Sequence, residues 1–267
     1  MPNLIDKETY DQASQQLPNI DSLKQTIGCL SPDLISTKFK SDSNLPIASV
    51  CFQDASRTLS ESRYALLESF AHRIWFFEKS NPHNETTGAF FSRYYADDAA
   101  LRLYSSAEHL AKAVVFILNI SDETIKNNRA GSRFNAVRKI LVASEPSHPI
   151  SQAIDKLYLS GTWKETIKYR DAWVHNQPPI IEGLGTMFER KRRWQITSKN
   201  TSVLGIGSGD PPLFSVDGLL AIIQPALVSF VETLGVAVDF YIHELEKKGI
   251  MINENKMQVS LFRRKAG

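Results

Sequence analysis

The chain has 267 residues, of which 42% are hydrophobic and 22% are charged, and this balance excludes a disordered or fibrous protein. Its 31 lysines and arginines and 29 aspartates and glutamates give a formal net charge of +2, which is compatible with nucleic acid but lacks the strong positive excess of dedicated DNA-binding proteins. The two cysteines, Cys29 and Cys51, form neither a CxxC pair nor a metal-type cluster, so we expect a reducing, cytoplasmic location, no metal site and no cofactor.

The N-terminal part is predicted to be an extension built from short helices. Residues 1–55 show weak periodicity and many Ser, Asn, Asp and Pro residues, and they begin without the apolar core of a secretory signal. The first strong helix is predicted to start at Ser60, a suitable N-cap, and to carry apolar residues at helical spacing as far as Phe77. The longest helix is predicted from about Thr87 to Leu118.

Shorter helices are predicted after this point. Ser121 is an N-cap signal for one of them, and apolar residues at helical spacing mark two more, around residues 134–141 and 154–158. A further helix carries Trp163 and Trp173, which we expect to be core residues.

Residues 178–213 differ in character and are predicted to be an insertion. They begin with two prolines, contain five glycines and include a predicted hairpin of Arg193–Thr197 against Ser202–Leu204. The last helix is predicted from about Val216 to Lys248, and a tail covers residues 249–267.

The last helix is apolar nearly all round, and its run from Leu219 to Ile242 is long enough to suggest a membrane span. Polar residues and a proline interrupt this run, however, at Gln224, Pro225, Glu232 and Asp239. We therefore expect no membrane partner and a buried helix, covered by its own bundle or by a second subunit. The predicted fold is all-α: a bundle of four to five long helices over residues 56–248, with a small β or irregular insertion before the last helix.

The candidate site lies at the end of the helix before the insertion, in the segment Arg170-Asp171-Ala172-Trp173-Val174-His175-Asn176. A guanidinium can hold phosphate oxygens and an imidazole can move a proton near neutral pH, which suits chemistry on a phosphodiester. On an unbroken helix Arg170 and His175 would lie roughly 140° apart. Because Gln177 precedes Pro178, we expect the helix to fail near His175, which would then be free to turn toward Arg170. The helix C-terminus would also favour the protonated imidazole.

A second Arg and His pair, Arg102 and His109, has a similar spacing in the longest helix. These two residues share a face but stand roughly 10 Å apart along the axis. We therefore expect His109 to be a partly exposed histidine of the bundle and not part of a site.

The segment from Tyr169 to Asn176 resembles the signature of HEPN domains, in which Arg is followed by Asn, Asp or His, a few apolar residues and then His. The segment Ser106-Ala107-Glu108-His109-Leu110-Ala111-Lys112-Ala113 is similar to an Ala-x-Glu-x-x-x-Lys stretch on an earlier helix of many members. The resemblance covers roughly residues 56–248. The chain departs from the family in its N-terminal extension and in the insertion between motif and last helix.

The resemblance implies a helical bundle that dimerises and, in many members, a metal-independent endoribonuclease of toxin–antitoxin, anti-phage or RNA-processing systems. It implies that Arg170 and His175 are the catalytic pair, oriented by Asp171, with Asn176 and Glu108 as supporting candidates. The implied partners are RNA, a second copy of the chain and an antitoxin protein. RNA carries its own nucleophile, the 2′-OH, so the site need only move protons and stabilise charge.

Plainer interpretations stay open for each of these residues. Arg170 can be a surface residue paired with Asp171 or Glu165, and Asp171 can pair with Lys168. His175 can satisfy carbonyl groups at the C-terminus of the helix, and Asn176 can be a helix C-cap. For Glu108, an ordinary surface salt bridge with Lys112 is favoured.

The densest basic run, Arg190-Lys191-Arg192-Arg193 beside Trp194, can contact an RNA backbone with one stacking aromatic, or can be a solvated hairpin edge. Two other functions compete with the nuclease. One is a non-catalytic module of the same fold that binds RNA or protein, and the other is a purely structural dimerisation bundle.

Overall fold

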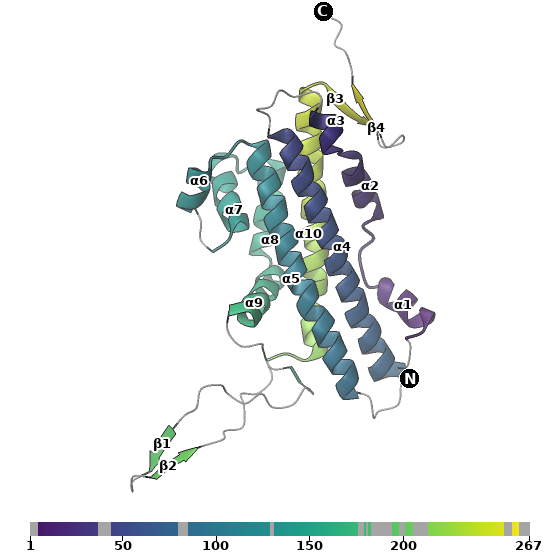
Figure 1. Cartoon of the computed structure of the whole chain (residues 1–267), viewed down its shortest axis with the longest axis vertical. Coiled ribbons are helices and arrows are strands. Elements are labelled where there is room, and N and C mark those ends of the chain that lie inside the picture. The colour runs from purple at the N-terminus through teal and green to yellow at the C-terminus, as the bar shows by residue number, and fades with distance from the viewer. Residues whose placement is uncertain are drawn as a thin grey trace, which may run out of the picture.

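The structure is a computed structural model, and it describes residues 5–36, 44–79, 85–128, 131–175, 179, 181–182, 194–197, 201–204, 213–253 and 258–261. These residues form ten α-helices, one π-helical segment and four short strands, which confirms the all-α prediction. Three helices of 30 or more residues, α4 (Leu45–Ile74), α5 (Glu85–Ile117) and α10 (Val216–Lys247), run side by side along the molecule (Figure 1). The core lies between them.

Short helices cover one side of α4, as predicted for the N-terminal extension. They are α1 (Lys7–Ser14), α2 (Asp21–Cys29) and α3 (Pro32–Ser36), and each packs on α4. The predicted helix start at Ser60 is wrong, because α4 begins fifteen residues earlier, at Leu45, and the predicted boundary at residue 55 falls inside it. Ser60 lies in mid-helix, where its hydroxyl donates to the carbonyl of Ser56 at 2.8 Å.

Small side chains explain both the close pairing of α4 with α5 and the missed start of α4. Serine hydroxyls of one helix donate to backbone carbonyls of the other: Ser62 to Ala99 at 2.8 Å, Ser106 to Ala55 at 2.7 Å, and Ser69 and Ser92 to each other's carbonyls at 2.6 and 3.0 Å. Alanine and serine let two helices approach closely, but they give little apolar contrast along the sequence. The α4 helix ends in the π-helical segment η1 (Trp75–Lys79).

The predicted shorter helices are present on the other side of α5 (Figure 1). They are α6 (Asp122–Asn128), α7 (Arg133–Ser144), α8 (Pro149–Leu159) and α9 (Gly161–His175). The hydroxyl of Ser121 accepts from the backbone N–H of Thr124 at 3.1 Å, which is the predicted N-cap of α6. Both α8 and α9 pack on α10, so α9 lies against the core and not on a loop.

The α10 helix is long and apolar enough to span a membrane by length and composition. Core helices pass the same test, and α10 packs against α4, α5, α8 and α9 with thirteen of its residues buried. This packing agrees with the predicted buried helix. Pro225 lies inside α10 and lacks the N–H that would bond to the carbonyl of Ala221. The next carbonyl of α10, that of Ile222, accepts from the hydroxyl of Thr166 on α9 at 3.2 Å, and this bond joins the two helices.

Two antiparallel hairpins complete the described residues. The strands β1 (Trp194–Thr197) and β2 (Thr201–Leu204) pair with Trp194 opposite Leu204, which confirms the predicted hairpin of the insertion. The strands β3 (Ile250–Asn253) and β4 (Gln258–Leu261) form a second hairpin in the tail, which was not predicted. Gly249, with a φ of 80°, makes the turn from α10 into β3.

Candidate functional site

Three side chains at positions 163, 166 and 169 anchor the motif-bearing helix α9 to the core. The Trp163 ring packs between Phe134 and Phe230, with ring centres 5.7 and 6.1 Å away. Thr166 bonds to α10 as described, and the ring of Tyr169 meets Phe214 edge to face at 5.4 Å. Since i, i+3 and i+6 lie on one helix face, this anchoring sets the direction of every following side chain of α9.

A largely buried carboxylate, Asp97 of α5, binds side chains of the last two turns of α9. The Tyr169 hydroxyl and the Trp173 indole both donate to it, and Arg93 lies 3.5 Å from its Oδ2. The Asp97 side chain is only 11% exposed, and this burial raises its pKa, an effect that the Tyr169 hydrogen bond and the charge of Arg93 partly oppose. Asp97 was not predicted as part of the site; the one signal for it in the sequence is its spacing of four from Arg93 on one helix.

Trp173 is not the core residue that was expected, since 37% of it is exposed. It lies in the last turn of α9, where its side chain bonds to Asp97 of α5 while part of the ring stays exposed. Trp163, by contrast, is buried as predicted.

Arg170 points toward α5. Its guanidinium carbon lies 4.0 Å from the ring centre of Tyr104, and its Nη1 donates to Oδ1 of Asp171 at 2.7 Å. The side chain is 18% exposed, and its buried Nε has no hydrogen-bond partner among the described residues. The pairing with Asp171 matches one plain alternative, but Arg170 is not a free surface residue. The predicted pair of Asp171 with Lys168 is replaced by a contact of Lys168 with Glu165 at 3.8 Å.

Tyr104 is the residue of this group that the sequence analysis did not single out. It lies one helical turn before Glu108 on α5, and burial, together with the nearby Glu108 carboxylate, raises the pKa of its phenol. Its ring gives the Arg170 guanidinium a flat, partly desolvated surface, where a cation–π contact is stronger than in open water.

His175 is the last residue of α9 and is exposed. The helix ends there as predicted, but it stays helical through His175, so the imidazole lies roughly 140° around the axis from Arg170. Arg170 faces α5 while His175 faces away, and one chain does not bring the two together. The expectation that the end of the helix would turn His175 toward Arg170 is therefore wrong. Asn176 and the run Arg190-Lys191-Arg192-Arg193 lie outside the described residues.

Glu108 has a structural role. Its carboxylate accepts from the backbone N–H groups of Arg133 and Phe134 at 3.2 and 3.1 Å, and so caps the start of α7. The favoured salt bridge with Lys112 is not formed within the described chain; the Lys112 ammonium lies 5.9 Å from the ring centre of Phe116 instead.

The second Arg and His pair is structural, as expected. Arg102 is bound by Asp98 and by Glu61, and His109 is partly buried on α5. Within the described ranges, no group of three or more His, Cys, Asp and Glu residues is arranged to hold a metal ion.

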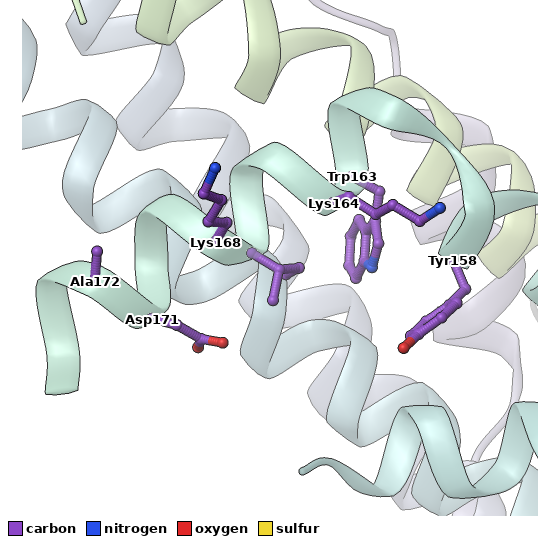
Figure 2. A pocket seen from close by; sticks show the side chains of 7 residues that line it. Tyr158, Trp163, Lys164, Lys168, Asp171 and Ala172 are labelled. Carbon is purple, nitrogen blue, oxygen red and sulfur yellow. The ribbon is translucent and has the colours of Figure 1, made fainter. Parts of the chain in front are cut away.

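A pocket of about 530 Å³ lies on the outer face of α9, directly beside the motif. Figure 2 shows the Asp171 carboxylate and the Tyr158 hydroxyl pointing from two sides into the space below the Trp163 indole. Lys164, Ile167, Lys168 and Ala172 complete the lining. Asp171 therefore both lines the pocket and binds Arg170.

No family model matches the chain, and no curated protein and no solved structure matches it. The resemblance to HEPN domains accordingly depends on the motif, on its position at the end of α9 and on the all-α bundle.

Proposed function

We propose that the protein is a cytoplasmic, metal-independent endoribonuclease of the HEPN type that works as a homodimer. The observation that carries the proposal is that an exposed histidine, His175, lies on the same helix as an arginine, Arg170, that Tyr104 and Asp171 hold in one orientation. A fixed guanidinium suits a charged phosphoryl group, and a solvent-accessible imidazole suits proton transfer.

The chemistry balances with these groups and RNA alone. The His175 imidazole takes the proton of the 2′-OH, whose oxygen attacks the adjacent phosphorus, and the imidazolium so formed protonates the 5′ oxygen as the bond from phosphorus to that oxygen breaks. The products are a 2′,3′-cyclic phosphate and a 5′-OH. Arg170 has N–H groups beyond the one donated to Asp171, and these are suited to the charged oxygens of the phosphorane.

The angle between the two residues is the reason for two copies. A phosphate cannot contact side chains roughly 140° apart on one helix, but a two-fold axis near the end of α9 would place Arg170 of one copy beside His175 of the other. Exposed apolar side chains supply a surface for such a contact: Trp173 and Val174 at the end of α9, and Phe90 and Tyr94 on α5, the helix that α9 contacts. An antitoxin protein would be expected to cover the same face.

The test is cleavage of mixed RNA by purified protein in EDTA. We expect fragments with 2′,3′-cyclic phosphate ends, and we expect His175→Ala to lose about 10²- to 10⁴-fold in rate, the usual contribution of general acid–base catalysis. His243→Ala is the matched control, because His243 is an exposed histidine of α10 far along the chain from the motif. Cleavage by His175→Ala at the wild-type rate would exclude this site.

The second candidate is a non-catalytic RNA- or protein-binding dimerisation module of the same fold. It is favoured by the engagement of Arg170 with Tyr104 and Asp171 and by its separation from His175. This function predicts RNA binding that depends on Arg170, with intact RNA recovered after incubation. The appearance of cyclic phosphate ends separates the two functions.

A further inference from the structure

The pocket on the outer face of α9 has a fixed apolar wall. Trp163 is buried between Phe134 and Phe230 and cannot move away, and Ile167 lies on the next turn of the same helix. A flat, mainly apolar ligand would replace water on this wall at little cost in side-chain order.

Two oxygens at the edges of the pocket are also fixed. The guanidinium of Arg138 lies 4.4 Å above the Tyr158 ring while donating to Asp155 at 2.6 Å, so the tyrosine is clamped with its hydroxyl toward the pocket. Asp171 is held by Arg170 through Oδ1, and its Oδ2 has no hydrogen bond within the described part of the chain. The side chain is half-exposed and still has accepting capacity toward the pocket.

The cations at the pocket are lysines. Lys164 and Lys168 line it, and both are exposed; the Lys168 ammonium lies 3.8 Å from a carboxylate oxygen of Glu165. An anionic group attached to a flat ligand would find these two charges within reach of long side chains.

We propose that this pocket binds a guanine nucleotide, with the guanine edge on Asp171 and Tyr158 and the phosphate near Lys164 and Lys168. Guanine alone among the common bases presents two adjacent N–H donors, N1–H and the N2 amino group, and a carboxylate has two oxygens at the matching spacing. Adenine places an acceptor beside its amino group, and uracil offers a single N–H, so both leave the carboxylate poorly paired. The nucleotide can be free or a residue of RNA; the RNA source rests on the proposed function.

Asp171 would then couple the binding of guanine to the orientation of Arg170. The same carboxylate that orients Arg170 would accept from the guanine, so a bound guanine and a correctly placed guanidinium would stabilise each other's arrangement. In an RNA strand this would place the guanosine next to the phosphate that Arg170 holds, and the pocket would set a preference for cleavage beside guanosine.

The experiment is calorimetric titration of the full chain with GMP and with IMP, which lacks only the N2 amino group. We expect GMP to bind at least about tenfold more tightly than IMP, the discrimination typical of a paired base contact. This comparison uses the wild-type protein and needs no variant to fold. Equal binding of GMP and IMP, or no binding of GMP, overturns the proposal.

Single and double variants test which residues cause the preference for GMP over IMP. Asp171→Asn is expected to abolish the difference between GMP and IMP, whereas Asp239→Asn, the same change at an exposed position of α10 outside the pocket, keeps it. Lys164→Ala/Lys168→Ala is expected to weaken GMP and IMP alike, and Lys156→Ala on α8 is the matched control for charge. A preference for GMP that survives Asp171→Asn overturns the assignment.

A third ligand, the trinucleotide UGU, separates the two sources. Tighter binding of UGU than of GMP identifies an RNA residue, and tighter binding of GMP identifies a free nucleotide; both support a guanine site. If GMP is preferred but no RNA is cleaved, the proposed nuclease fails and this site stands. If RNA is cleaved but GMP and IMP bind alike, the opposite holds.

Discussion

The guanidinium of Arg170 and the ring of Tyr104 lie 4.0 Å apart, atom to ring centre, and join α9 to α5 at the candidate site. A second contact holds the same guanidinium, because the carboxylate of Asp171 accepts from Nη1 at 2.7 Å. Arg170 is thus held between a ring and a carboxylate before any substrate arrives, and this reduces the entropy lost when it binds a phosphate.

The first prediction concerns this stacking. Tyr104→Ala removes a cation–π contact of about 0.5–2 kcal/mol, which corresponds to about a 2- to 30-fold slower cleavage if the orientation of Arg170 matters in the transition state. Tyr104→Phe keeps the ring and is expected to cleave at nearly the wild-type rate. Single-turnover rates with saturating RNA measure both variants, and equal rates for the alanine and phenylalanine variants would refute the role of the stack.

The second prediction concerns sharing of the site between two copies. Arg170→Ala and His175→Ala are each expected to be inactive. Mixed in equal amounts and allowed to exchange subunits, they should recover about a quarter of wild-type activity, because half of the dimers are mixed and one of the two sites in each mixed dimer is intact.

The double variant Arg170→Ala/His175→Ala mixed with wild type is the control, since its mixed dimers contain no intact site of this kind. If the two single variants stay inactive after exchange has been shown by size or mass, the two residues do not act across an interface.

The sequence predicted where α9 ends. The Gln177-Pro178 pair marks the end of α9, and α9 does end at His175, two residues before it. The expected failure of the helix near His175 extended the effect of Pro178 too far, because a proline disfavours helical geometry only in the residue just before it, Gln177, and α9 stays regular through His175.

The partners of the motif were beyond prediction for a different reason. Helical periodicity indicates which face of α9 is buried, but not which residues of α5 meet that face. Tyr104 and Asp97 lie more than sixty residues from Arg170 and Tyr169, and only the packing angle of the two helices selects them. In α4, apolar residues are buried from Leu45 onward, but the small Ala48, Ser49 and Ala55 between them weaken the apolar pattern, and the first turns of that helix were missed.

The third prediction concerns Glu108, which the structure makes a helix cap. Glu108→Ala removes the acceptor for two backbone N–H groups at the start of α7 and is expected to lower the free energy of unfolding by about 0.5–2 kcal/mol. Glu145→Ala, which removes an exposed carboxylate beyond the other end of α7, is the control. Denaturant unfolding measures the change, and cleavage per folded molecule should stay the same; a loss of cleavage without loss of stability would instead place Glu108 in the site.

The last prediction concerns the pH dependence given by Asp97. Because burial raises the pKa of this carboxyl group in the folded protein above its ordinary value of 3.8, the folded state holds the proton more tightly than the unfolded state. This tighter proton binding contributes to the free energy of unfolding. The contribution is fully present below about pH 3.8 and is lost as the pH rises through the raised pKa of the folded state. The wild type should therefore lose stability relative to Asp97→Asn across that window.

Denaturant unfolding of both proteins at a series of pH values from 3 upward measures this difference, with Asp239→Asn on the exposed side of α10 titrated in parallel as background. The informative result is the direction in which the stability difference between wild type and Asp97→Asn changes with pH. A carboxylate stabilised mainly by its ion pair with Arg93 would give the opposite trend, with the wild type gaining on Asp97→Asn as the pH rises. That outcome would show that the pairing outweighs the cost of burying Asp97, and that the end of α9 is held by a charge pair and not by a carboxyl group that resists ionisation.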